Sequence, residues 1–182
     1  DLMISLNVIF YMYVILFAFI GGMRGWAKEL LVMFSVILAM FLTTVMERYI
    51  PFVRDNLAVN APATLFWIRA VLLLSLAFFG YQTPNLPKLA GSPRFARERL
   101  QDILLGGFLG AVNGYMVVGT LLAYLHAANY PFPIIIPPNP NDPMGQATIN
   151  LIALMPPHWL GTTPIIFFAV GIAFLFVIVV FI

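Results

Sequence analysis

Long apolar stretches, separated by short polar or proline-containing breaks, dominate the chain. A helix that crosses the roughly 30 Å hydrocarbon core of a bilayer needs roughly 20 apolar residues at about 1.5 Å per residue. Five stretches meet this requirement, at about residues 2–22, 27–46, 63–81, 103–125 and 165–182. A backbone in lipid must satisfy its hydrogen bonds internally, and no alternating strands appear, so these stretches are predicted to be helices. The pattern predicts an all-α integral membrane protein with a bundle of five transmembrane helices.

The same pattern divides the chain into three parts. Residues 1–125 hold four predicted spans, residues 126–163 form an outward-facing arm, and residues 164–182 form the fifth predicted span. The arm holds eight of the 14 prolines, which predicts an extended outer loop, with a short interfacial helix near residues 147–155. The last span has no polar flank and position 1 is not methionine. We therefore expect further residues before Asp1 and after Ile182.

Composition narrows the class of protein. The chain is 62% hydrophobic and 9% charged, with a mean hydropathy of +0.99, whereas a soluble domain carries about a quarter charged residues. A water-soluble globule and a disordered chain are therefore excluded. The net charge of +2 is too small for a nucleic-acid-binding surface. The chain has no cysteine, which excludes disulfides, cysteine-ligated zinc and iron–sulfur clusters.

Basic residues indicate the orientation. Six of the nine lie between the first and second or the third and fourth predicted spans: Arg24, Lys28, Lys88, Arg94, Arg97 and Arg99. The positive-inside rule places both loops in the cytoplasm, so the amino terminus and the arm face outward and the carboxyl terminus faces inward.

The loop between the third and fourth spans carries a helix-start signal. Ser92 followed by Pro93 predicts a short helix at the cytoplasmic headgroups. Its arginines, Arg94, Arg97 and Arg99, either hold anionic lipid headgroups or only fix the topology. The second interpretation is favoured.

Glycines follow a regular spacing in the fourth predicted span. Gly106, Gly110 and Gly114 recur every four residues, beside Gly107 and Ala111. This spacing places a smooth stripe on one helix face, which favours close helix–helix packing inside this chain or against another.

Few side chains offer chemistry. Arg69 is the one ionisable residue clearly inside a predicted span, which makes it a functional candidate, although pairing with Glu47 or Asp55 in the outer loop is favoured. His126 and His158 are too few to form a metal or haem site and are interpreted as interfacial. Because no catalytic constellation is apparent, we predict no enzyme activity, cofactor or metal.

Two motifs resemble the colicin V production protein family. Residues 24–31, RGWAKELL, are similar to the arginine–glycine–aromatic…glutamate signature that opens the family's second span. Residues 102–114 resemble its aspartate followed by spaced glycines. The resemblance covers roughly residues 2–125 and implies a bacterial inner-membrane protein with four core helices, linked to colicin V export and envelope physiology. The signature positions that it implies are Arg24, Gly25, Glu29, Asp102, Gly106, Gly110 and Gly114.

Two features depart from the family pattern. Asn113 stands where a basic residue is expected, and the arm and fifth span follow the shared core. Arg24, Glu29 and Asp102 all fall at the predicted cytoplasmic boundary, and we hypothesise that they close a polar network between the second and fourth spans.

These observations favour a non-catalytic accessory or scaffold subunit that docks with other membrane subunits in a larger bacterial complex. An energy-transducing quinone oxidoreductase or a photosynthetic assembly is a candidate host. The alternative is a transport or secretion factor of the colicin V production type, which would require a polar cavity at the membrane midplane.

Overall fold

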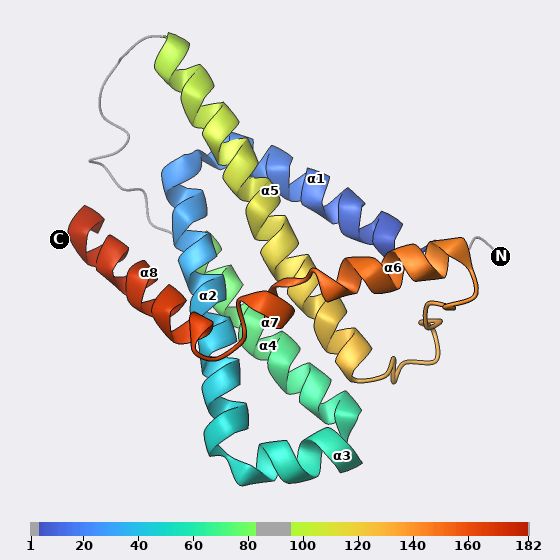
Figure 1. Cartoon of the computed structure of the whole chain (residues 1–182). Coiled ribbons are helices and arrows are strands. Elements are labelled where there is room, and N and C mark those ends of the chain that lie inside the picture. The colour runs from blue at the N-terminus through green and yellow to red at the C-terminus, as the bar shows by residue number, and fades with distance from the viewer. Residues whose placement is uncertain (1–3, 83–95, 182) are drawn as a thin grey trace.

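The computed structural model describes residues 4–82 and 96–181, and within them every regular element is helical (Figure 1). Four helices are long and apolar enough to cross a membrane: α1 (Leu6–Arg24), α2 (Trp26–Tyr49), α4 (Pro62–Tyr81) and α5 (Ala96–Ala127). The last helix, α8 (Ile165–Phe181), is apolar but shorter, with 17 residues or about 26 Å of helix. The described chain is therefore all-α, with four potential spans and a fifth, shorter apolar helix.

The first connection is tighter than the sequence suggested. Arg24 was expected in a loop between two spans, but it ends α1; Lys28 lies in α2, within the predicted second span, and only Gly25 separates the two helices. Gly25 has a φ of +87°, a backbone conformation that is unfavourable for residues other than glycine. A glycine here lets the chain change direction sharply within one residue, and the motif at residues 24–31 lies at this end of the bundle (Figure 1).

The charged segment before the fourth span is also different. Ala96–Leu100 continue directly into α5 and form no separate surface helix. The segment from Ala96 to Asp102 contains no glycine or proline and consists mainly of good helix formers, so nothing interrupts the helix. Arg99 thus lies on α5 itself. Ser92, Pro93 and Arg94 lie outside the described residues, as does the side chain of Arg97.

Short helices connect the spans at the opposite end: η1 (Val53–Leu57), α3 (Ala58–Asn60), α6 (Pro143–Ala153) and α7 (Pro156–Trp159). α6 begins earlier than the helix predicted near residue 147. Asp142 caps it, accepting hydrogen bonds at 3.1 Å from the backbone N–H groups of Met144 and Gly145, and Pro143 takes the first helical position. Residues 128–142 form no helix or strand, but they are not extended throughout as expected. They contain turns, closed by hydrogen bonds such as that from the Ile135 N–H to the Phe132 carbonyl at 3.0 Å.

α2 lies at the centre of the bundle. α5 crosses it and packs along α1, while α4 and α8 also pack against α2 (Figure 1). The core consists of apolar side chains from these helices, and its fully buried members include Val32, Val36, Leu73 and Ile166. The two ends of the bundle are named here by their buried or half-buried acids: the Glu29 end, where α1 stops and α2 starts, and the Glu47 end, where α2 stops and α4 starts.

Candidate functional site

The polar centre of the Glu29 end is a fully buried carboxylate. Glu29 lies in the first turn of α2 and is ion-paired with Arg24, which ends α1 and is 19% exposed. Both charges suit their helix termini, because an acid is favourable near an amino-terminal end and a base near a carboxyl-terminal end. The pair therefore joins α1 to α2 next to the turn at Gly25.

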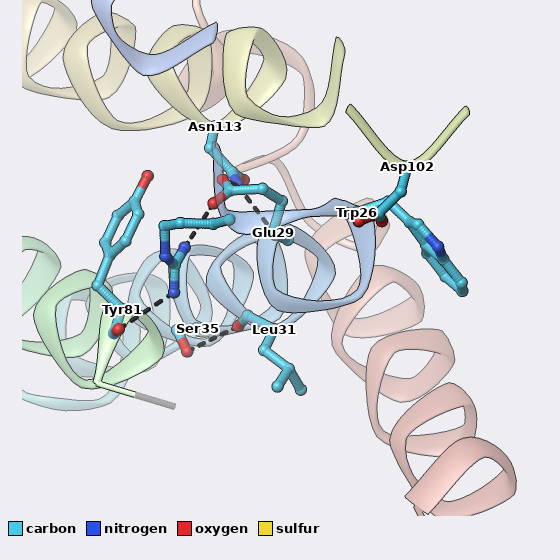
Figure 2. A network of polar contacts seen from close by, with 8 residues as sticks. Trp26, Glu29, Leu31, Ser35, Tyr81, Asp102 and Asn113 are labelled. Atoms are coloured by element: carbon cyan, nitrogen blue, oxygen red, sulfur yellow. Dashed lines mark hydrogen bonds and ion pairs between the residues drawn. The ribbon is translucent and has the colours of Figure 1, made fainter. Parts of the chain in front are cut away.

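Asn113 brings α5 into the same cluster. Its Nδ2 donates hydrogen bonds to Oε2 of Glu29 at 2.7 Å and to the Glu29 backbone carbonyl at 2.9 Å, and the side chain is fully buried. Figure 2 shows the two side chains directed toward each other. The resemblance noted in the sequence leads one to expect a basic residue at this position. An amide fits better, because Arg24 already neutralises Glu29 and a second buried cation would lack a counter-charge.

α4 contributes through Tyr81. Nη2 of Arg24 donates a hydrogen bond to the Tyr81 backbone carbonyl at 3.1 Å, and the guanidinium lies 4.4 Å from the centre of the Tyr81 ring. The cluster of Arg24, Glu29, Tyr81 and Asn113, which we call the Glu29 network, thus links α1, α2, α4 and α5. Within this network, Oδ1 of Asn113 and the Tyr81 hydroxyl are buried without a hydrogen-bond partner among the described residues.

Asp102 lies at the same end but has another role. Its Oδ1 accepts a hydrogen bond at 3.2 Å from the backbone N–H of Trp26, the first residue of α2 (Figure 2). A Cβ at Gly25 would lie 2.8 Å from Oδ2 of Asp102. The sequence hypothesis grouped Asp102 with Arg24 and Glu29; the structure brings Arg24 and Glu29 together, whereas the side-chain contact of Asp102 is with the start of α2.

The glycine stripe packs against α1 of the same chain. A Cβ at Gly21 would lie 2.7 Å from Cα of Gly110, and it would also collide with the Gly106 carbonyl. A Cβ at Gly114 would lie 2.8 Å from Cβ of Phe17. Backbone therefore touches backbone where α1 and α5 cross. This close approach positions Asn113 beside Glu29.

At the Glu47 end, Arg69 of α4 is ion-paired with Glu47 of α2. Its guanidinium also lies 5.3 Å from the centre of the Tyr124 ring. Of the two acids that the sequence offered, Glu47 is the partner, because Asp55 pairs with the adjacent, exposed Arg54 at 2.6 Å. The Glu47–Arg69 pair lines a cavity of about 210 Å³.

The cavity wall is half polar. Thr43 and Thr44 of α2 and His158 of α7 line it together with the ion pair. The other histidine, His126, does not reach it and instead contacts the hydroxyl of Tyr130, 3.0 Å from its Nδ1. Burial raises the pKa of Tyr130, which lies in the arm, to about 12.

Neither polar cluster resembles a metal centre. Within residues 4–82 and 96–181, no three histidine, cysteine, aspartate or glutamate side chains gather closely enough to hold a metal ion. Each cluster consists of one acid and one base with hydroxyl, amide or aromatic neighbours, and such an arrangement can hold helices together or bind a small polar group.

Comparison with protein-family models, curated proteins and solved structures finds no match for this chain.

Proposed function

We propose that the protein is a non-catalytic membrane subunit that docks in a larger assembly. The observation that carries the proposal is an apolar patch in the arm, outside the spanning helices. Ile134 is 91% exposed and Ile136 is 64% exposed, and both line a hollow with the half-exposed Ile4, two residues before α1. Burying water-exposed isoleucines of an irregular segment against a partner removes apolar surface from water, which stabilises the complex.

The ion pairs support a structural role for the interior. Glu29 pairs with Arg24 and Glu47 pairs with Arg69, each across two helices. Charges used in this way stabilise the arrangement of the bundle and leave the outer faces of α1 and α8 to apolar side chains such as Phe19. Those faces suit lipid or the helices of neighbouring subunits equally well, whereas the arm patch suits a protein partner.

Site-specific photo-crosslinking tests the docking proposal. Benzoylphenylalanine replaces Ile134 in the chain expressed in its own membrane, and a matched control carries it at Val59 of α3, which is 74% exposed at the same end of the bundle. We expect a discrete adduct with another membrane protein from position 134 and none from position 59. Equal, diffuse adducts from both positions would contradict docking through the arm.

We also propose that α8 is a fifth span and that the Glu29 end faces the bacterial cytoplasm, as the distribution of basic residues favours. The chain contains no cysteine, so single-cysteine variants report topology directly. An impermeant maleimide added to intact cells is expected to label Val59→Cys at the Glu47 end but not Leu100→Cys on α5. The reverse pattern would contradict this orientation.

The resemblance to the colicin V production family remains a proposal. Its support is spatial: the two motifs lie about 75 residues apart in sequence, yet Asp102 contacts Trp26, and a Cβ added at Gly106 would lie only 3.0 Å from Cα of Gly25. A shared architecture would predict that these pairs also meet in family members.

A transport or secretion role is the second candidate. The half-polar cavity beside Arg69 and Glu47 favours it, although this cavity lies at the Glu47 end of the bundle and not at the midplane position that the role requires. Uptake or efflux that is lost in Arg69→Leu, in a chain that still inserts and folds, would support this role over docking. Unchanged flux would exclude the cavity as part of a transport path.

A further inference from the structure

An apolar groove runs between α1 and α5 on the side of their crossing that the close packing leaves open. It has a volume of about 880 Å³ and is lined mainly by Ile15, Ala18, Phe19, Gly22, Leu104 and Gly107. Phe19 and Leu104 are largely exposed, so the groove is continuous with the apolar surface of the bundle. Its volume lies within the roughly 300–1,000 Å³ typical of sites that hold small molecules.

The glycines that line this groove differ from those in the crossing. A Cβ at Gly107 would meet its nearest atom, the Ala18 carbonyl oxygen, at 3.5 Å, and one at Gly22 would meet the Ile103 carbonyl oxygen at 3.4 Å. Both are ordinary van der Waals distances. Helix packing therefore does not require glycine at either position, in contrast to Gly21. What the absent side chains provide is the depth of the groove.

Charge marks one end of the groove. Arg99, an exposed residue at the start of α5, and Asp102 line its mouth at the Glu29 end. The Asp102 carboxylate already accepts a hydrogen bond from the Trp26 backbone N–H at 3.2 Å, where it also meets the amino-terminal end of α2. The positive charge of Arg99 is therefore available to a ligand at the membrane surface, at the end of the apolar groove.

We propose that this groove binds an anionic phospholipid, with one acyl chain against Gly22 and Gly107 and the phosphate at Arg99. An apolar groove between two spanning helices can bury an acyl chain, and a guanidinium at the end of the groove can form charged hydrogen bonds with a phosphate. The complementarity of charge at the mouth favours a lipid over a helix of a second protein, which would meet Arg99 with an acid only by coincidence of sequence.

Lipid titration monitored by native mass spectrometry tests the proposal. The full chain, purified in detergent, is titrated with phosphatidylglycerol or with phosphatidylcholine of the same acyl chains. We expect one saturable site that prefers phosphatidylglycerol. Gly107→Leu fills the groove and is expected to abolish that site for both lipids, whereas Gly171→Leu, at an α8 position with nothing within 4 Å of an added Cβ, leaves it intact.

The headgroup contact is tested separately. Arg99→Gln is expected to raise the half-saturating concentration of phosphatidylglycerol about fivefold, the effect of about 1 kcal/mol per basic residue at a membrane surface. Its effect on phosphatidylcholine is expected to be smaller, because the choline cation of that lipid already offsets the phosphate charge. The matched control Arg54→Gln, whose arginine is exposed at the Glu47 end, is expected to leave the binding of both lipids unchanged.

The thermal unfolding midpoint of each variant is measured to check that the variant is folded. If Gly107→Leu unfolds early, Gly22→Leu fills the same groove from the α1 side. Unchanged lipid binding in a folded groove variant would overturn the proposal. A groove variant that loses a co-purifying protein but still binds the lipid would also overturn it, because a partner helix would then occupy the groove.

Discussion

Removing the charge of Glu29 while keeping its shape isolates the contribution of the Glu29 network. In Glu29→Gln, the amide oxygen still accepts the hydrogen bond that Asn113 donates at 2.7 Å. The ion pair with Arg24, which is 19% exposed, is lost, while the hydrogen bond that Arg24 donates to the Tyr81 carbonyl is kept. The expected result is a destabilised but folded bundle.

The magnitude follows from burial. Removing one partner of a buried ion pair costs roughly 3–5 kcal/mol, because the other charge is left without compensation. Arg24 is partly exposed and lies at the end of its helix, so its charge regains some solvation, and we expect about 3 kcal/mol. For a chain of this size, about 2–4 °C of midpoint shift per kcal/mol gives a decrease of roughly 6–12 °C.

A double-mutant cycle provides the assay. Unfolding free energies in mixed micelles are measured for Glu29→Gln, for Arg24→Gln and for the double variant, which contains neither charge. We expect the double variant to be less destabilised than the sum of the single variants by about 2 kcal/mol, within the range found for coupled pairs. The exposed pair Arg54–Asp55 provides the control cycle, in which no coupling is expected. Additive effects at Glu29 and Arg24 would refute the reasoning.

Three further predictions concern other parts of the bundle. Gly110→Ala places a methyl group 2.9 Å from Cα of Gly21 and is expected to lower stability by about 1–3 kcal/mol. The control Gly171→Ala, in open space, is expected to be neutral or slightly stabilising. Equal thermal unfolding midpoints for the two variants would contradict the close crossing of α1 and α5. Arg69→Leu leaves Glu47 without its partner and is expected to lower the unfolding midpoint more than the double variant Arg69→Leu/Glu47→Leu, a difference that vanishes if the pair is not formed. Burial raises the pKa of Tyr130 to about 12 in the folded state, so the unfolded chain loses this proton first and stability falls between about pH 10 and 12; Tyr130→Phe, followed by alkaline unfolding, should show a shallower fall than the parent chain.

Periodicity predicts helices reliably here because lipid leaves the backbone little choice. The apolar stretches correspond to α1, α2, α4, α5 and α8. Gly106 and Gly110, whose spacing predicted a face suited to close packing, lie against the backbone of α1. The boundaries were less predictable. Arg24 was assigned to a loop because charge was taken as the end of a span, yet charged side chains at helix ends can reach the membrane surface and leave the helix intact.

The composition of the Glu29 network shows where sequence reasoning stops. In the sequence, Asn113 stood out only as a departure from the family pattern, and its partner Glu29 lies 84 positions away. The sequence around Asn113 or Glu29 does not specify that the two side chains meet. Their proximity depends on how closely Gly21 lets α1 approach α5. The backbone carbonyl of Tyr81 was not predictable at all, because every residue carries one.

The mass of the native particle tests the central claim that this chain serves as a docked structural subunit. The chain is extracted from its own membrane in a mild detergent and examined by gel filtration with light scattering, which separates the protein mass from the detergent. We predict a defined particle much heavier than the 20.3 kDa chain and containing other membrane proteins in fixed ratio. A lone 20.3 kDa chain, stable and folded in its detergent, would contradict the account.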